Sequence, residues 1–205
     1  MQRQEGKEKL DRKYSLLVLA STFPRYIGDT EPRFVYDLCQ NLKNKFNITI
    51  LVPSFPGAAK HVEMEGLDIV RFRYALNRFE TLAYPGAIMS RIYQKKWRVL
   101  LVPGFILGMC LAIKKLCKSE KYDVAHVHWL IPQGVVASFF RKSFFPPYLL
   151  TGHGGDVTSL NKGVIKKLKE RAIRKAGEVT LVSQPLLNDL LSNYSLDSCA
   201  DVCPM

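Results

Sequence analysis

The chain of 205 residues lacks the short motifs that mark several common enzyme classes. No GxGxxG follows its first apolar segment, and neither GxxxxGK[ST] nor GxSxG occurs anywhere in it. These patterns bind dinucleotides, cradle nucleoside triphosphates and expose a nucleophilic serine, respectively. The sequence therefore disfavours ordinary dinucleotide binding, P-loop chemistry and a hydrolase nucleophile elbow.

Cysteines and long apolar runs are also scarce. The five cysteines form no CxxC and no framework typical of secreted proteins. Cys39, Cys110 and Cys117 lie in apolar helical patterns, which predicts buried free thiols, a reducing compartment and a cytoplasmic location. The longest uncharged apolar stretch covers the fifteen residues 99–113, shorter than the ~20 that a spanning helix needs. It is consistent with a core helix or an interfacial one.

The first thirteen residues, MQRQEGKEKLDRK, contain no hydrophobic segment. A secretory signal peptide requires one, so we expect residues 1–13 to be a polar N-terminal tail.

Acidic residues are outnumbered, which gives a formal net charge of +12. Most of the excess lies in residues 87–121 and 162–175, which carry net charges of +7 and +6. Such patches suggest an anionic partner, either phosphate, a membrane surface or nucleic acid, although a solvated helix face explains 162–175 equally well. Residues 162–175 contain no aromatic residue, and neither basic segment carries a nucleic-acid recognition motif, so we expect no nucleic acid partner.

Strand-like and helix-like segments alternate along the chain. Near-continuous apolar runs predict strands, and segments with helical spacing separate them. This alternation predicts an α/β, Rossmann-like three-layer domain with a mostly parallel sheet and helices on both faces. The predicted strands cover residues 14–21, 47–52, 66–72, 123–128, 148–151 and 178–182.

Two helix details are also predicted. Thr30 is the candidate N-cap of a helix that Glu31 and Pro32 begin. Residues 91–118 are predicted to be helical with an interruption near Pro103 and Gly104.

Distinctive residues follow the predicted strands. Because ligands bind beyond the carboxyl ends of parallel strands, the loops containing Gly28, His128 and His153 are expected to meet at one edge of the sheet. His153 is flanked by glycines in TGHGGD, which would allow backbone to approach a ligand, although Gly154 and Gly155 are equally consistent with a plain turn. His126 and His128 share a strand face, but no third ligand has suitable spacing, so no metal is expected.

Five motifs in order resemble the N-terminal half of a family 4 retaining glycosyltransferase of the GT-B fold. They are ASTFPRYIGDTEPRFVYDLCQNL, GLDIVRFRYALNRFETLAYPG, YDVAHVHWLIPQGVVAS, LLTGHGGDV and AGEVTLVSQPLLNDL. The resemblance implies that residues 14–205 form the acceptor-side Rossmann-like domain, whose last strand ends in ADVCPM, and that the C-terminal donor domain is absent. It implies a hexosyltransferase that uses a nucleotide-diphosphate sugar, needs no metal or other cofactor, and acts on a glycan or lipid-linked acceptor. The chain alone is then expected to be inactive.

The resemblance also assigns roles to individual residues. It places His153 and Asp156 at the catalytic centre. Gly28, Asp29, Gly154 and Gly155 would lie on the side of the donor phosphates, where Asp29 departs from a common Gly-Gly pair and would repel a diphosphate. Arg33, His128, Trp129 and Gln133 would lie on the acceptor side.

Two other functions fit the same motifs. One is a GT-B sugar-nucleotide epimerase, which would need further carboxylates at the site. The other is a non-catalytic module that recruits a separate donor-binding subunit to a membrane. Peripheral contact with an anionic membrane is expected from Trp97 together with Arg91, Lys95, Lys96 and Arg98 beside the apolar run. The oligomeric state is left open.

Overall fold

The computed structural model describes residues 13–194 and 200–205, which form one eight-stranded sheet with the strand order β3-β4-β2-β1-β5-β6-β7-β8. Every neighbouring pair is parallel except β3 and β4, which are antiparallel. The strands are β1 (Tyr14–Leu19), β2 (Phe46–Pro53), β3 (His61–Met64), β4 (Leu67–Phe72), β5 (Val124–His128), β6 (Tyr148–Gly152), β7 (Glu178–Leu181) and β8 (Ala200–Val202). The predicted mostly parallel α/β fold is confirmed.

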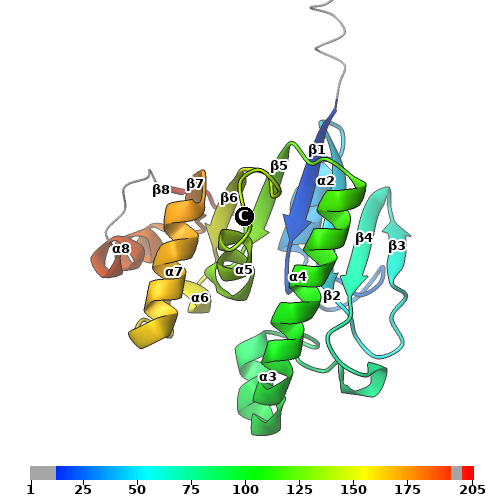
Figure 1. Ribbon diagram of the computed structural model, residues 1–205, viewed down its shortest axis with the longest axis horizontal. Coiled ribbons are helices and arrows are strands. Elements are labelled where there is room, and N and C mark those ends of the chain that lie inside the picture. The colour runs from blue at the N-terminus through cyan, green and yellow to red at the C-terminus, as the bar shows by residue number, and fades with distance from the viewer. Residues whose placement is uncertain (1–12, 195–199) are drawn as a thin grey trace, which may run out of the picture.

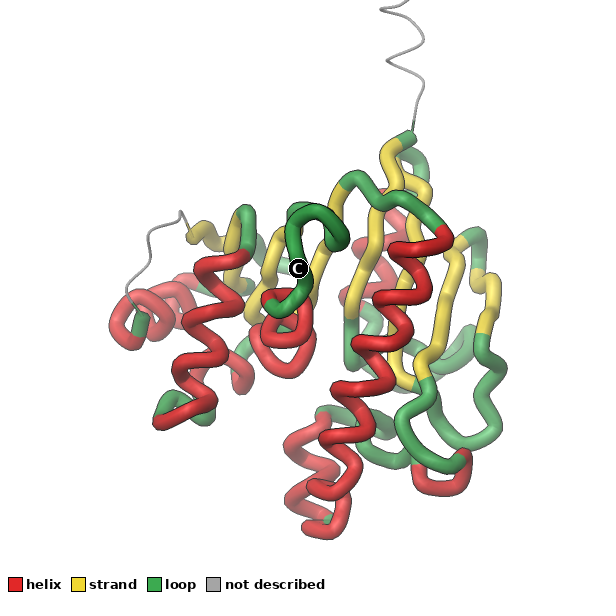
Figure 2. Tube along the Cα trace, in the orientation of Figure 1, coloured by secondary structure: helices red, strands yellow, loops and turns green. Residues whose placement is uncertain are grey.

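Helices cover both faces of this sheet. Figure 1 shows α4 and α7 in front of the strands and α2 behind them, and Figure 2 shows the same layers by element type. The α-helices are α2 (Phe34–Leu42), α3 (Ile88–Gln94), α4 (Val102–Ser119), α5 (Val135–Ser138), α6 (Gly155–Thr158), α7 (Gly163–Lys175) and α8 (Gln184–Asn193). Shorter helical turns are the 3-10 segments η1 (Asn77–Phe79) and η2 (Lys96–Leu101) and the π segment η3 (Leu130–Gly134).

Strand β1 shows why the strands are apolar on both sides. Successive side chains point to opposite faces, so Leu17 and Leu19 join the core under α4 and α7. Leu16 and Val18 join the other core, against α2. A strand between two helix layers cannot alternate apolar with polar residues, and this is the pattern from which the fold was predicted.

Helix α4 packs closely against the chain that follows β4. Phe105, Met109 and Ile113 recur every four residues on its buried face. Gly104 and Gly108 lie on the same side: an added Cβ would sit 2.4 Å from the carbonyl oxygen of Tyr74 and 2.2 Å from that of Arg73. Only glycine permits this approach, which fixes the face that α4 turns inward.

The predicted interruption at Pro103 and Gly104 is wrong. Pro103 lies in the first turn of α4, where its missing N–H removes no helical hydrogen bond. The helical segment instead breaks near Lys95, which is extended, between α3 and η2.

The predicted start of the first helix is also wrong. Helix α2 begins at Phe34, with Arg33 at the N-cap position and no side-chain capping bond. Thr30 instead belongs to the preceding loop, where its N–H donates to the Asp29 carboxylate at 2.8 Å. Loop contacts thus outweigh the local capping signal.

One strand was not predicted from the sequence: the edge strand β3 pairs with β4 across the turn at Glu65 and Gly66. Strand β8, of three residues, lies in ADVCPM, where the motif resemblance placed the end of the last strand. Of the three cysteines predicted to be buried, Cys39 is buried, whereas Cys110 and Cys117 are half-buried.

Candidate active site

Three loops meet at one edge of the sheet. Strands β1, β5 and β6 are neighbours, and their carboxyl ends lie at the same edge because all three are parallel. Phe34, which follows the β1 loop, has its ring centroid 5.0 Å from that of His153 and 5.9 Å from that of Trp129. The Trp129 and His153 rings are 4.7 Å apart. The predicted convergence of the loops after β1, β5 and β6 is confirmed by these contacts.

His153 and His128 are hydrogen-bonded to each other. The distance between His128 Nδ1 and His153 Nε2 is 3.0 Å. His128 is the last residue of β5 and is fully buried, whereas His153 follows β6 and is partly exposed. An imidazole pair bonded in this way needs one ring to donate and the other to accept, so the tautomers of the two residues are linked.

A polar strip extends this pair across three strands. The rings of His126 and His128 are tilted by 33° with centroids 4.0 Å apart, and His126 Nε2 lies 2.8 Å from Thr151 Oγ1 on β6. Thr151 Oγ1 in turn lies 2.7 Å from Thr180 Oγ1 on β7. Polar side chains that bond to one another can occupy a largely buried sheet face, because each supplies the other's hydrogen bond.

Burial keeps the three histidines neutral. It lowers the pKa of His126 and that of His153 to about 4, with the neighbouring His126 also lowering the latter. Burial lowers the pKa of His128 further below its ordinary range, and both neighbouring imidazoles act in the same direction. All three are therefore uncharged near neutral pH.

The Asp156 carboxylate fixes the backbone of the site. It accepts hydrogen bonds from the N–H groups of Leu130 (2.8 Å), His153 (3.0 Å) and Gly154 (2.9 Å). Burial raises its pKa even though these donors favour the charged form. Asp156 thus joins the loop after β5 to the loop after β6.

The glycines beside His153 have different tasks. Gly154 has a φ of +149°, which side-chain-bearing residues rarely adopt, and this conformation turns the chain from His153 into α6. Gly155 is the first residue of α6. A helix of four residues makes no anion site by itself, so a phosphate-side role for Gly154 and Gly155 stays a prediction.

Trp129 is held in an unusual backbone conformation. Its φ is +71° and its ψ is +132°, a combination that costs about 1–3 kcal/mol for a residue with a side chain. Its N–H donates to the Thr151 carbonyl (2.8 Å), and its carbonyl accepts from Gly134 (3.1 Å). These bonds present the indole beside His153, and an acceptor-side role for Trp129 stays a prediction.

The other predicted acceptor-side residues differ in exposure. Arg33 is exposed and forms an ion pair with Asp37 at 3.2 Å. Gln133 and His128 are buried, so direct contact with an acceptor is not what this geometry offers. Instead, His128 acts on the site only through its hydrogen bond to the His153 ring.

Asp29 carries a compensated charge. Its carboxylate forms a two-point ion pair with Arg25, with both distances 2.8 Å, and Arg25 lowers the pKa of Asp29 to about 2. The prediction that Asp29 would repel a diphosphate assumed a bare charge, and this pair largely cancels it. The neighbouring Gly28 lies in an exposed turn of the same loop.

Several residues of the site were not predicted. Phe34, Thr151 and Thr180 belong to apolar patterns and carried no separate signal. Arg71 is buried near the end of β4 and donates to the Arg25 carbonyl at 2.9 Å. This bond ties the loop that follows β1 to β4. A charged residue inside an apolar run, IVRF, was the signal that could have found it.

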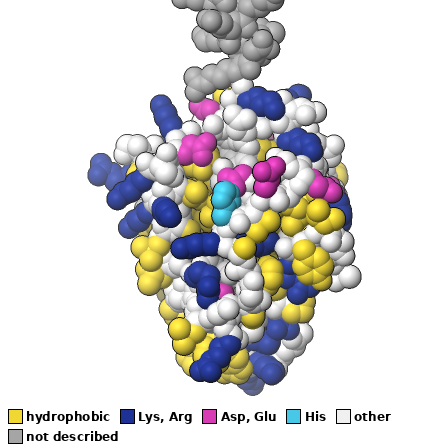
Figure 3. Space-filling model, turned by 90° about the vertical axis from the view of Figure 1, so that its right-hand side faces the viewer, with side chains coloured by type: hydrophobic (Ala, Val, Ile, Leu, Met, Phe, Trp, Pro, Cys, Tyr) yellow, Lys and Arg dark blue, Asp and Glu magenta, His cyan; other side chains and the backbone are white. Residues whose placement is uncertain are grey.

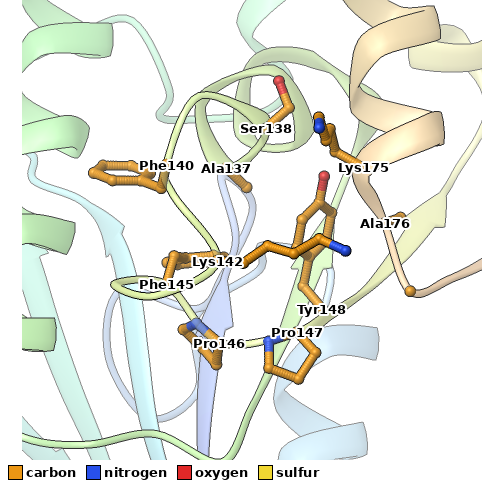
Figure 4. A pocket seen from close by; sticks show the side chains of 11 residues that line it. Ala137, Ser138, Phe140, Lys142, Phe145, Pro146, Pro147, Tyr148, Lys175 and Ala176 are labelled. Atoms are coloured by element: carbon orange, nitrogen blue, oxygen red, sulfur yellow. The ribbon is translucent and has the colours of Figure 1, made fainter.

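The site shows no sign of a metal centre. Among the described residues, no group of three or more His, Cys, Asp or Glu side chains is placed to hold a metal ion. A cavity of about 140 Å³ lies at the opposite end of β6, where Lys142, Tyr148 and Lys175 contribute to its walls (Figure 4). It is therefore separate from His153.

Comparison with known proteins identifies the family. The family model of Glycosyltransferase Family 4 matches residues 32–204. An uncharacterized glycosyltransferase of Methanocaldococcus jannaschii is 26% identical over 152 residues, which cover 71% of this chain and 42% of that protein.

Solved structures share the fold. Sucrose-phosphate synthase from Thermosynechococcus elongatus matches with a TM-score of 0.62 at 12% identity, over 94% of this chain and 48% of that chain. A structure described as trehalose-6-phosphate from E. coli bound with UDP-2-fluoro glucose matches with a TM-score of 0.55 at 12% identity, over 87% and 43%. The chain thus spans less than half the length of these relatives. It belongs to Glycosyltransferase Family 4, and its fold is one Rossmann-like half of the GT-B type.

Proposed function

We propose that this chain is the acceptor-binding half of a nucleotide-sugar-dependent glycosyltransferase that transfers a hexose-type sugar to a glycan or lipid-linked acceptor. The observation that carries the proposal is the neutral His153 at the carboxyl edge of the sheet, bonded through one ring nitrogen to the buried His128. The donor-binding half, with the groups that hold the nucleotide, would be a second domain facing this edge.

The hydrogen bond to His128 leaves the other nitrogen of His153 available. His153 Nδ1 makes no hydrogen bond within the described residues, yet it is not one of their buried polar atoms without a partner. It is therefore open to a ligand. His128 Nε2, by contrast, is buried and has no partner among the described residues.

This asymmetry favours one tautomer pair. If His153 donated to His128, the N–H of His128 would be buried without an acceptor, and buried unsatisfied N–H groups are rare. If His128 donates instead, only an unprotonated nitrogen is left buried, and His153 presents Nδ1–H to the ligand. A hydroxyl oxygen of the transferred sugar is a suitable acceptor for that donor.

The neutrality of His153 suits the reaction. Breaking the bond between sugar and diphosphate builds positive charge on the sugar and negative charge on the leaving group. An imidazolium beside the sugar would oppose the first of these charges, whereas a neutral N–H donor positions the sugar without repelling it. The Arg25–Asp29 pair likewise leaves the Gly28 loop without a bare negative charge near the leaving diphosphate.

The epimerase alternative is disfavoured by the carboxylates. Asp156 is engaged by three backbone N–H groups, and Glu31 accepts the Gly86 N–H at 2.9 Å. Asp156 is therefore committed to holding the two loops, and no hydrogen bond joins Glu31 to His153 among the described residues. Retention of anomeric configuration stays a proposal that rests on the family resemblance.

The test uses His153 variants of a protein in which this chain is joined to a donor-binding domain. His153→Ala should lower kcat by at least about 100-fold, as expected for loss of a positioned donor at the reacting sugar. His128→Leu should give a smaller loss and leave KM for the acceptor nearly unchanged. Near-normal turnover of His153→Ala would remove His153 from the site, and micromolar binding of a nucleotide sugar to this chain alone would refute the assignment of the donor site.

A further inference from the structure

Segment α3–η2–α4 exposes an unusual number of large apolar side chains. Leu100 is 77% exposed, Leu107 60% and Leu111 56%. We define the apolar–basic surface by its apolar members and by the exposed lysines beside them. The apolar members are Tyr93, Trp97, Val99, Leu100, Leu107 and Leu111, and the lysines are Lys95, Lys96, Lys114, Lys115 and Lys118.

The surface follows one side of α4. Leu107 and Leu111 are four residues apart, and Lys114, Lys115 and Lys118 continue the same stripe for two more turns. The opposite side of the helix is committed to the core by Phe105, Met109 and the close approach of Gly108 to Arg73. The leucines therefore cannot turn inward without unpacking α4.

The segment that carries these cations holds no acidic residue before Glu120. Residues 81–119 contain neither Asp nor Glu. In Figure 3 the lower end of the visible face carries hydrophobic and basic side chains, and the large acidic groups lie above its middle. Figure 1 shows α3 projecting beyond the end of the sheet toward which β1 points.

Two predicted members of the basic set, Arg91 and Arg98, are used internally. Arg91 is half-buried and donates to the Thr81 carbonyl (3.3 Å) and to Gln94 Oε1 (2.9 Å). Arg98 is buried, and it donates to the Arg91 carbonyl (2.8 Å) and to Thr81 Oγ1 (3.3 Å). These bonds join η2 to α3 and to the preceding loop. Arg98 thus holds the segment in shape while Lys95 and Lys96 face solvent.

We propose that the apolar–basic surface binds the surface of an anionic phospholipid bilayer. Leucine, tryptophan and tyrosine side chains would enter the interfacial region, and the lysines would contact lipid phosphates. Charge decides between the occupants: two copies of this chain meeting through the surface would oppose like charges, whereas anionic lipid complements them.

The contact is peripheral and does not cross the membrane. The helical segment Lys96–Ser119 is long and apolar enough to span a bilayer. Of the residues in its most apolar 18-residue stretch, 17% are buried inside the protein. Crossing would withdraw Phe105, Met109 and Ile113 from the core that they share with the sheet. Binding along the exposed side leaves this packing intact.

The test is cosedimentation of the chain with vesicles, which needs no enzymatic activity and so stands apart from the proposed function. The chain should bind vesicles of phosphatidylcholine mixed with phosphatidylglycerol, bind pure phosphatidylcholine weakly, and lose binding as salt is raised. In a Trp129→Phe variant, the remaining Trp97 fluorescence should shift to the blue on binding.

Matched charge reversals locate the surface. Lys114→Glu with Lys115→Glu should weaken binding by at least about 30-fold, because each lysine near an anionic surface contributes about 1 kcal/mol. Lys45→Glu with Lys60→Glu makes the same change in net charge at exposed positions elsewhere and should weaken binding far less. Leu107→Ser with Leu111→Ser should also reduce binding, with an unchanged circular dichroism spectrum.

Three outcomes would overturn the proposal. One is absence of binding to the anionic vesicles. Another is an equal loss of vesicle binding in the two charge-reversal variants, which would show that binding depends only on the net charge of the chain. The third is self-association of the chain that Leu107→Ser with Leu111→Ser abolishes, which would make the surface an interface between copies.

Discussion

The histidine strip at the sheet edge and the apolar–basic surface depart from the usual distribution of side chains in opposite directions. At the sheet edge, His126, His128 and Thr151 are polar groups on a largely buried face. On α4, Leu107 and Leu111 are apolar groups in solvent. Burying polar groups and exposing apolar groups are both unfavourable unless something compensates. Hydrogen bonds compensate within the histidine strip, whereas nothing in the described part of the chain covers the leucines. The strip is satisfied within the protein except at His128 Nε2, whereas the surface implies a partner.

The largest expected effect concerns the buried side of α4. Gly108→Ala should lower the free energy of unfolding by about 1–3 kcal/mol, because the new Cβ would overlap the Arg73 carbonyl at 2.2 Å. In an uncrowded helix the same change would stabilise by about 1 kcal/mol. Urea denaturation measures the difference. A stabilised variant would contradict the close packing that fixes which face of α4 is exposed.

An intermediate effect concerns acidification of the histidine strip. Between the folded pKa of about 4 for His126 and its ordinary value of 6.5, the unfolded chain binds more protons. Stability therefore rises with pH across this window and is lost as pH falls through it, by about 2 kcal/mol at pH ~4.5 for His126 alone. Urea denaturation at several pH values measures the slope.

The control for this slope is a variant that changes no titratable group. His126→Gln should flatten the dependence, and Leu107→Ser with Leu111→Ser, at exposed positions on α4, should leave it unchanged. Asp29 does not contribute here, because its effect on stability falls between its lowered pKa of about 2 and its ordinary value of 3.8, below this window. Equal slopes in the two variants would show that the strip is not desolvated.

The smallest expected effect concerns the leucines of the apolar–basic surface. Leu107→Ser with Leu111→Ser should change the free energy of unfolding by less than about 1 kcal/mol, because both side chains are mostly exposed. Thermal unfolding of the chain without lipid checks this. A loss of several kcal/mol would mean that these leucines are buried against the protein in solution.

Part of the site was predictable because it depends on strand order. His128 and His153 each end an apolar run, and parallel strands bring their carboxyl ends to one edge, so their proximity followed from the fold class. The Asp29–Arg25 pair was not predicted, since it depends on the path of a loop. The role of Asp156 was not predicted either, because its three donors come from two loops that only the folded chain brings together.

The sequence by itself determined the layered α/β architecture, because doubly buried strands must be apolar throughout and helices must carry one apolar stripe. It also determined the excess of positive charge and the position of His153 after a strand. Tertiary structure alone decided that His128 supports His153, that Arg98 is internal and that Leu107 faces solvent. Each of these depends on contacts between segments distant in sequence, and local residue patterns carry no information about which side chains those contacts will cover.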